Sequence, residues 1–156
     1  MQRTTLAMAV VAAVVFGLVG WYAGSKSAKV TFLSHPQQTK DCRGRDCDNR
    51  IKFDCVDPAQ PTAATCVPYP EYEVLLVTHG KKIEFNIDSP ADFKFDPTDG
   101  IKFTSANSGS FFPCQSQGPK KFKCDNNIPD GTPSDVYKYA IHVQGMNKVD
   151  PFVVNY

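Results

Sequence analysis

Residues 71–88, EYEVLLVTHGKKIEFNID, contain the clearest strand pattern in the chain. After the central His79-Gly80, apolar side chains at Ile83, Phe85 and Ile87 alternate with polar ones, so they share one face of an extended segment. A second apolar segment precedes the glycine. Two such segments around a short turn predict a β-hairpin whose turn lies at His79-Gly80.

Similar short segments recur on both sides of this one. Residues 93–105, FKFDPTDGIKFTS, predict a second hairpin with an Asp-, Pro- and Gly-containing turn. Residues 136–143 and 151–156 predict a final pair of strands, and residues 118–124 predict one short strand at most. Residues 57–70 contain four prolines and predict a loop. Because helical periodicity is almost absent, the sequence predicts an all-β sandwich.

The length and composition fit one folded domain with a terminal appendage. The chain has 156 residues, of which 42% are hydrophobic and 21% are charged, as in a folded globule. Residues 1–40 carry four cations and no acid, whereas residues 41–156 carry 13 Lys and Arg against 16 Asp and Glu. A domain with this acidic balance lacks the clustered cations that nucleic-acid binding needs, so no nucleic-acid partner is expected.

The N-terminal segment has the composition of a membrane-directed segment. Leu6 to Ala23 are 18 consecutive residues without charge or proline, and as a helix they would span ~27 Å, close to the thickness of the hydrocarbon core. Trp21 and Tyr22 stand at the far end, where aromatic side chains favour the membrane interface. We predict an uncleaved transmembrane anchor in contact with lipid. The alternative is a cleaved signal peptide that would release a secreted, disulfide-rich module.

This assignment divides the chain into an anchor over 1–24, a tether over 25–40 and a domain over 41–156 on the extracytoplasmic, periplasmic or extracellular, side of the membrane. Small residues recur at close spacing along the anchor, a pattern that lets helices approach one another in lipid. A contact with another membrane protein through this helix is therefore a second prediction. The small residues nearest its end are Gly17, Gly20 and Gly24.

Six cysteines, an even number, follow the membrane-directed segment. In an exported domain this predicts disulfides formed in an oxidising compartment. We expect sequential pairing, because each bond then closes a short loop flanked by turn-forming residues. A zinc site is the rival interpretation, but the Cys-x4-Cys spacing of the first pair has no matching second pair. The expected disulfides are Cys42–Cys47, Cys55–Cys66 and Cys114–Cys124.

The end of the chain, GTPSDVYKYAIHVQGMNKVDPFVVNY over 131–156, resembles the last two strands of the cupredoxin-like sandwich. The resemblance implies a Greek-key arrangement of the strands. It also implies copper ligands at His142 and Met146 in the final hairpin, with His79 as the earlier histidine. A copper-binding or electron-transfer protein is therefore an alternative function.

The cysteine ligand of that family has no counterpart in this sequence, and blue-copper chemistry needs its thiolate. Lys138, Tyr139 and Ala140 occupy the positions shortly before His142 where it should lie. Strand parity also places His142 on the polar face, opposite the apolar face that contains Tyr139 and Ile141. We therefore expect no metal cofactor, with His142 as a surface residue.

No catalytic motif stands out, since the sequence has no glycine-rich phosphate loop and no nucleophile elbow. We predict a non-catalytic binding or accessory domain held at the outer face of a membrane. A partner surface is expected in residues 110–124, where a disulfide would stiffen a loop of aromatic and cationic residues. The alternative is that the phenylalanines are core and the lysines solvated. The residues concerned are Phe111, Phe112, Lys120, Lys121, Phe122 and Lys123.

Overall fold

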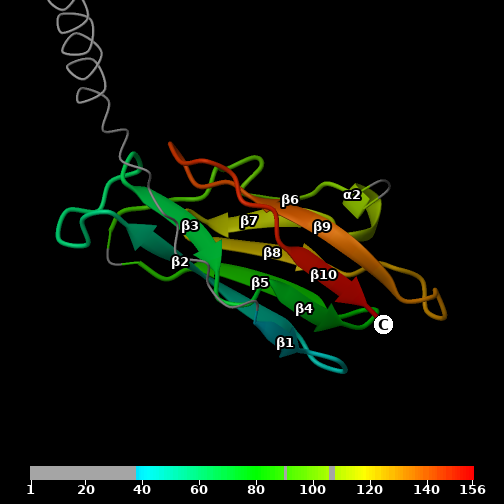
Figure 1. Cartoon of the computed structure of the whole chain (residues 1–156). Coiled ribbons are helices and arrows are strands. Elements are labelled where there is room, and N and C mark those ends of the chain that lie inside the picture. Colours follow the sequence, from blue (N-terminus) through cyan, green and yellow to red (C-terminus); the bar gives the residue numbers. More distant parts are fainter. Residues whose placement is uncertain (1–37, 90, 106–107) are drawn as a thin grey trace, which may run out of the picture. The chain divides into compact units, whose positions relative to one another are not determined.

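A computed structural model describes residues 38–89, 91–105 and 108–156 (Figure 1). The predicted anchor over 1–24, its small residues Gly17, Gly20 and Gly24, and all but the last three residues of the predicted tether lie outside the described residues. Within the described ranges, no helix is long and apolar enough to span a bilayer.

The described residues form an all-β structure with one short helix. Turns and loops connect the strands and the helix, as the many turn-forming residues predict. In chain order the elements are β1 (Thr39–Asp41), β2 (Cys47–Cys55), β3 (Cys66–Pro70), β4 (Val74–Val77), β5 (Lys82–Ile87), β6 (Ile101–Phe103), α2 (Ser108–Phe111), β7 (Cys114–Gly118), β8 (Lys121–Asp125), β9 (Asp135–Ile141) and β10 (Phe152–Asn155).

The strands form two mixed five-stranded sheets. Sheet 1 has the order β1-β4-β10-β9-β6, so β10 is its central strand (Figure 1). In this sheet β1 and β10 both run parallel to β4, whereas β9 runs antiparallel to β10 and to β6. Sheet 2 has the order β3-β2-β5-β8-β7, in which only the β2–β5 pair is parallel.

The core lies between the two sheets, because each sheet contributes one alternating set of apolar side chains. Phe85 of β5 and Tyr139 of β9 are fully buried and meet across it, with ring centroids 5.1 Å apart. Phe122 of β8 contacts Phe95 at 5.3 Å between ring centroids. Such aromatic pairs bury much apolar area and fix the distance between the sheets.

The predicted hairpin over 71–88 is wrong, although both of its strands exist. β4 belongs to sheet 1 and β5 to sheet 2, so the chain crosses from one layer to the other at His79-Gly80. Gly80 has a φ of 72°, a left-handed conformation that glycine adopts without strain. The same turn chemistry thus serves a crossing between sheets instead of a hairpin.

Other strand predictions are confirmed or corrected by the pairing. The final pair is confirmed as β9 and β10, in antiparallel register from Phe152↔Lys138 to Asn155↔Asp135. Residues 93–105 do not pair with each other, because Phe95 bridges to Val143 and β6 pairs with β9. The predicted loop over 57–70 ends in strand β3, and the predicted lone strand near 118–124 is half of the β7–β8 hairpin.

The three disulfides are confirmed with the expected sequential pairing. Two of them join directly opposed residues of neighbouring strands, at Cys55↔Cys66 and Cys114↔Cys124. The Cys42–Cys47 bond is different, because Cys42 follows β1 of sheet 1 and Cys47 begins β2 of sheet 2. This bond therefore ties the two sheets together at one edge of the sandwich.

Candidate interaction surface

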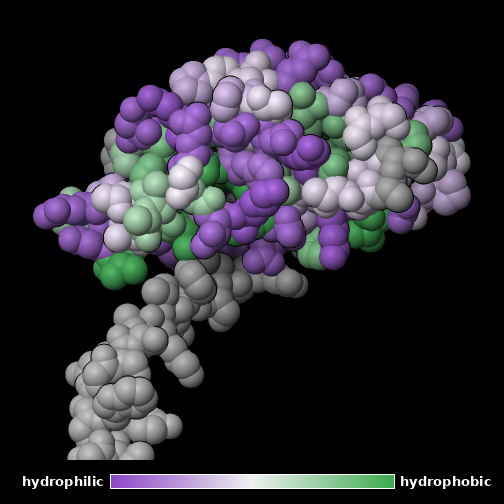
Figure 2. Space-filling view, turned by 90° about the horizontal axis from the view of Figure 1, so that it is seen from above, coloured by the Kyte–Doolittle hydropathy of each residue, from purple (hydrophilic) through white to green (hydrophobic). Residues whose placement is uncertain are grey.

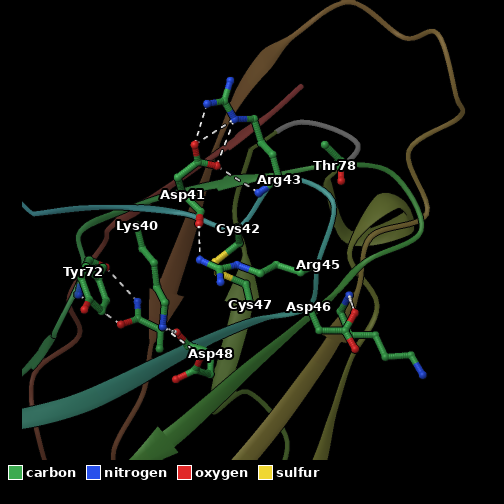
Figure 3. Close-up of a disulfide and its surroundings, with 12 residues drawn as sticks. Lys40, Asp41, Cys42, Arg43, Arg45, Asp46, Cys47, Asp48, Tyr72 and Thr78 are labelled. Carbon is green, nitrogen blue, oxygen red and sulfur yellow. Dashed lines mark hydrogen bonds and ion pairs between the residues drawn. A yellow bond between two sulfur atoms is a disulfide. The ribbon is translucent and has the colours of Figure 1, made fainter.

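The Cys42–Cys47 disulfide supports a charged turn at the edge of the sandwich (Figure 3). Both cysteines are buried, whereas the residues between them are exposed. The Gly44 amide donates to Thr78 Oγ1 at 3.1 Å, and the Lys82 amide donates to Asp46 Oδ1 at 3.0 Å. The turn is thus fixed by contacts with the ends of strands from both sheets.

Asp41 organises the charges of this turn. Its carboxylate accepts from the backbone amide and the Nε of Arg43, both at 3.0 Å, and its carbonyl accepts from Arg45 Nη2 at 3.0 Å. These hydrogen bonds from Arg43 lower the pKa of Asp41 to about 2. Asp41 therefore keeps its negative charge through the physiological pH range and holds two arginines at the edge of sheet 1.

A second ion pair lies on the other side of the disulfide (Figure 3). Lys40 Nζ donates to Asp48 Oδ1 at 2.9 Å and lies 4.9 Å from the centroid of the Tyr72 ring. Lys40 alternates with Asp41 along β1, so its side chain turns towards sheet 2 and Asp41 turns towards the outward face of sheet 1. The turn therefore presents its arginines beside that outward face.

The outward face of sheet 1 is apolar along its centre. In β4 and β10 every second residue is buried in the core, and the alternate residues are half-buried on the outside. The register places Phe152 beside Val74, and Val154 between Leu76 and Val136. Val136 and Tyr156 are large hydrophobic residues that remain 53% and 49% exposed. We call Val74, Leu76, Val136, Phe152, Val154 and Tyr156 the apolar strip.

A cation lies over an aromatic ring on each side of the apolar strip. The Arg43 guanidinium lies 5.3 Å from the centroid of the Tyr156 ring, and Lys138 Nζ lies 5.4 Å from that of the Phe152 ring. Such contacts draw long cationic side chains onto apolar surface while their heads stay in water. The strip is therefore framed by charge, as in protein contact sites with an apolar centre and a polar rim.

The outward face of sheet 2 has the opposite character. Its alternate positions carry ion pairs, with Lys52 Nζ at 2.8 Å from Glu71 and Lys121 Nζ at 2.7 Å from Glu84. A charged, solvated face of this kind is common on antiparallel-rich sheets. Over the side of the domain that Figure 2 shows, hydrophilic residues also predominate, with smaller hydrophobic areas between them. The apolar strip thus distinguishes one sheet face from the other.

The apolar strip is not among the surfaces predicted from the sequence, although a signal for it is present there. The segments VLLV (74–77) and FVV (152–154) are continuous apolar runs, unlike the alternating KIEFNI (82–87). A continuous run indicates a strand that meets apolar surroundings on both faces. The hairpin prediction for residues 71–88 rests on the alternating half of that stretch and leaves this second signal unused.

The predicted partner surface in residues 110–124 is wrong for its aromatic residues. Phe112 and Phe122 are only 2% and 1% exposed, and Phe112 stacks on Phe103 with ring centroids 4.1 Å apart. Phe111 is half-buried against the core. Lys120 and Lys121 make different contacts within the domain. The alternative interpretation, in which the phenylalanines belong to the core, describes these residues better.

Two of the three lysines in residues 110–124 make polar contacts within the domain. Lys120 Nζ donates to the carbonyl oxygens of Ser89 at 3.3 Å and Ala91 at 3.0 Å, while Lys121 pairs with Glu84. Lys123 is half-buried on the outward face of sheet 2. Lys120 and Lys121 therefore have structural contacts and do not share an aromatic surface with Lys123.

The three candidate copper ligands are not brought together. His79 lies in the exposed turn after β4, whereas His142 follows β9. β9 runs opposite to β10, and β10 runs parallel to β4, so these two histidines lie at opposite ends of sheet 1. Met146 lies in the turn that its amide closes on the Val143 carbonyl at 3.1 Å. In the described ranges no group of three or more His, Cys, Asp and Glu residues is placed to hold a metal ion.

His142 has the predicted strand parity but is half-buried. Its backbone is fixed on the 96–100 turn, since its amide donates to the Gly100 carbonyl and its carbonyl accepts from the Asp96 amide. Its Nε2 is enclosed and has no hydrogen-bond partner among the described residues. Burial lowers the pKa of His142, and Lys148 lowers it further, against the opposing effect of Asp99 and Asp96.

We predict that the domain loses stability as the pH falls below about 6.5, the ordinary pKa of histidine. Because the folded state disfavours the charged ring, protonation favours the unfolded chain, and the contribution of His142 is complete only above that pH. Urea unfolding at pH 7.5 and pH 5.5 measures the effect. His142→Gln should reduce the difference between the two pH values, whereas His79→Gln, in its exposed turn, should not. Equal pH dependence in all three proteins would refute the prediction.

Comparisons with known proteins do not identify a family for this chain. No protein-family model matches the chain, and a search of the curated proteins finds no match either.

Proposed function

We propose that the chain is a membrane-anchored, extracytoplasmic binding or accessory domain without catalytic activity. The observation that carries this proposal is the apolar strip on the outward face of sheet 1, with Arg43 and Lys138 over its outer rings. An apolar centre with an aromatic and cationic border favours contact with another protein surface. Arg, Tyr and Phe are also the residue types enriched in such contacts.

The proposed location rests on two further features. Residues Leu6 to Ala23 are apolar and uncharged over a length that suits a membrane span. Three disulfides support folding in an oxidising compartment, outside the cytoplasm. Together they favour a single-pass protein with its domain on the periplasmic or extracellular side.

We also propose that the sandwich has a Greek-key, cupredoxin-like topology. Support comes from the mixed sheets, in which β2 and β5 pair in parallel across an intervening β3 and β4, and from the final antiparallel β9–β10 pair. Connections that leave one sheet and return to it are typical of Greek-key sandwiches. The copper function of that family is not part of the proposal, because the cysteine ligand has no counterpart.

The proposal is tested by photo-crosslinking in intact cells. A photoreactive amino acid replaces Val154, in the apolar strip, or Val67, a half-buried strand valine on the outward face of sheet 2. We expect covalent protein adducts from position 154 and few from position 67, since only the first lies in the proposed contact face. Equal labelling from both positions, or none from position 154, would contradict a binding role for this face.

The two alternatives give different results in simple measurements. The intact mass of the mature protein, and its release from membranes by detergent but not by salt, separate an uncleaved anchor from a secreted module. Copper titration of the metal-free chain beside His142→Ala tests the electron-transfer alternative. Tight binding that the substitution abolishes would favour copper over the proposed function.

A further inference from the structure

We propose that Asp130 and Gly131 form a site of spontaneous covalent modification, at which Asp130 closes to a succinimide ring that reopens to isoaspartate. The site lies in the loop between β8 and β9, and the inference does not depend on the proposed binding function. Three observations carry it: the contact between the two reacting groups, the exposure of the turn that holds them, and a second Asp-Gly pair that the fold restrains.

The reacting groups of this site already touch. The Gly131 amide donates to Asp130 Oδ1 at 3.1 Å, so the carboxyl group lies against the nitrogen that closes the ring. Ring closure forms a bond between this nitrogen and Cγ of Asp130. The hydroxyl oxygen of the carboxylic acid leaves together with the amide proton as water. Because the two groups are held together beforehand, much of the entropic cost of the step is removed.

Hydrolysis of the ring completes the modification, with water as the only co-reactant. Water adds to one of the two ring carbonyl carbons, and the bond from that carbon to the nitrogen breaks. Attack at Cγ restores aspartate. Attack at the main-chain carbonyl gives isoaspartate, in which the chain runs through Cβ and Cγ and the former main-chain carbonyl is a free carboxylate. The product has the mass of aspartate but an additional methylene group in its main chain.

The turn leaves the peptide between Asp130 and Gly131 able to rotate. Both residues are exposed, and among the described residues a Cβ built on Gly131 would meet nothing within 4 Å beyond its chain neighbours. The φ of Gly131 is 78°, and glycine can leave this conformation for many others at low cost. The Thr132 amide and hydroxyl group donate to the Pro129 carbonyl at 3.2 and 2.7 Å, so the flanking residues are held.

The sequence contains one other Asp-Gly pair, Asp99-Gly100, and its surroundings restrain it. The Asp99 carboxylate lies 3.3 Å from Lys102 Nζ. Gly100 is buried, and its carbonyl accepts from the His142 amide at 2.8 Å. A Cβ built on Gly100 would lie 2.5 Å from the Phe122 ring, so the glycine is packed tightly against the core. The fold therefore hinders ring closure at this pair and permits it at the other.

Asp135 provides a second comparison within the chain. The Val136 amide donates to Asp135 Oδ1 at 2.7 Å, which is the same kind of contact as at Asp130. These two residues begin β9, however, and they pair with Asn155 and Val154 of β10. The branched valine side chain crowds its own nitrogen, and the strand pairing fixes the peptide. We therefore expect little reaction at Asp135 although its contact is shorter.

The modification should change the turn and leave the sandwich folded. On one side of the turn Ile128 is fully buried, and its amide donates to Asn126 Oδ1 at 3.2 Å. On the other side β9 is held by its pairing with β10. The additional methylene group therefore lengthens the exposed part of the loop between two anchored ends.

The test compares the folded and the unfolded full chain. The purified, disulfide-bonded protein is incubated in mildly acidic buffer with or without urea, then reduced and digested with trypsin. Peptide 124–138 contains Asp130 and Asp135, and peptide 95–102 contains Asp99. Electron-transfer fragmentation distinguishes isoaspartate from aspartate, and a succinimide is lighter by one water molecule. A sample digested without incubation gives the background.

The folded chain should carry at least about tenfold more modification at Asp130 than at Asp99 or Asp135. In urea Asp99 should react about as much as Asp130, because both precede glycine and the fold no longer restrains either. Asp135 should stay low in both samples, since its valine remains. No modification at Asp130 in the folded chain, or a preference over Asp99 that is absent or equally large in urea, would overturn the inference.

Asp130→Glu is the matched control variant. Glutamate keeps the negative charge but would have to close a larger ring, which forms far more slowly. The signal from peptide 124–138 should therefore disappear in this variant, while the signal at Asp99 in urea should remain. Isoaspartate that persists in peptide 124–138 of the variant would assign the modification to Asp125 or Asp135 and overturn the inference.

Discussion

Reduction of the three disulfides should unfold most of the domain at physiological temperature. In the chain-entropy account, loops of 5, 11 and 10 residues contribute about 2 to 3 kcal/mol each, or about 7–8 kcal/mol together. That sum is comparable to the whole free energy of unfolding of a domain this size, which is typically about 5–15 kcal/mol. Thermal unfolding followed by circular dichroism, with and without a phosphine reductant, measures the loss.

Two controls accompany the predicted loss of stability on reduction. Thiol titration of the denatured, non-reduced protein should find no free cysteine, because all six are paired. Replacement of Cys42 and Cys47 by Ala removes the bond between the sheets and leaves the two that join neighbouring strands. We expect this variant to lie between the oxidised and the fully reduced protein. An unchanged melting temperature after complete reduction would show that the bonds do not support the fold.

Tyr139→Ala should be strongly destabilising, because it removes a large side chain from the centre of the core. The side chain is fully buried, and its ring centroid lies 5.1 Å from that of Phe85 and 5.6 Å from that of Phe103. Truncation would leave a cavity between the sheets, and large-to-small changes of aromatic core residues cost about 3–5 kcal/mol. The change in the free energy of unfolding by urea tests this value.

Two companion variants separate the ring from its hydroxyl group. Asn49 Nδ2 donates to Tyr139 Oη at 3.3 Å, but it also donates to the Tyr72 carbonyl at 2.8 Å and so keeps a partner. Tyr139→Phe should therefore cost only about 1 kcal/mol. Tyr156→Ala, at a tyrosine that is 49% exposed, should also cost under about 1 kcal/mol. If Tyr139→Ala cost no more than Tyr156→Ala, the central packing described for the two sheets would be wrong.

The positions of the strands can be predicted from the sequence wherever one face of a strand is buried and the other is exposed to solvent. Along β5 the alternation of Ile83, Phe85 and Ile87 with polar residues gives the buried face directly, and all three are buried. The same parity identifies the inward face of β9. The disulfide pairing is also predictable, because residues so close in the sequence find one another before distant cysteines do.

Pairing between strands is less predictable, because it depends on contacts far apart in the sequence. The His79-Gly80 turn permits a hairpin and a crossing between sheets equally well, since its local chemistry is the same for both. Pro68 and Pro70 predict a loop where the structure has β3. This strand lies at the edge of sheet 2, where the missing amide hydrogens cost no ladder bond.

The candidate site is the least predictable part. Arg43, Asp41 and Tyr156 meet only because β1 and β10 flank the same strand β4. Conversely, Phe122 resembles a surface residue in the sequence, because lysines and a cysteine surround it. Strand alternation in β8 places its side chain in the core and its lysine neighbours on the outward face. A pattern along the chain does not show which distant residues share a surface.

The central position of β10 also sets the order in which the domain can fold. All five strands of sheet 2 precede residue 126, so during synthesis that sheet can form before β10 is available. Sheet 1 cannot, because β4 and β9 have no link until residues 152–155 arrive between them. Until then the backbone edges of β4 and β9 that β10 joins are unpaired, and such edges can pair with other chains. Sheet 1 is therefore completed only by residues 152–155, after the other described strands have been made.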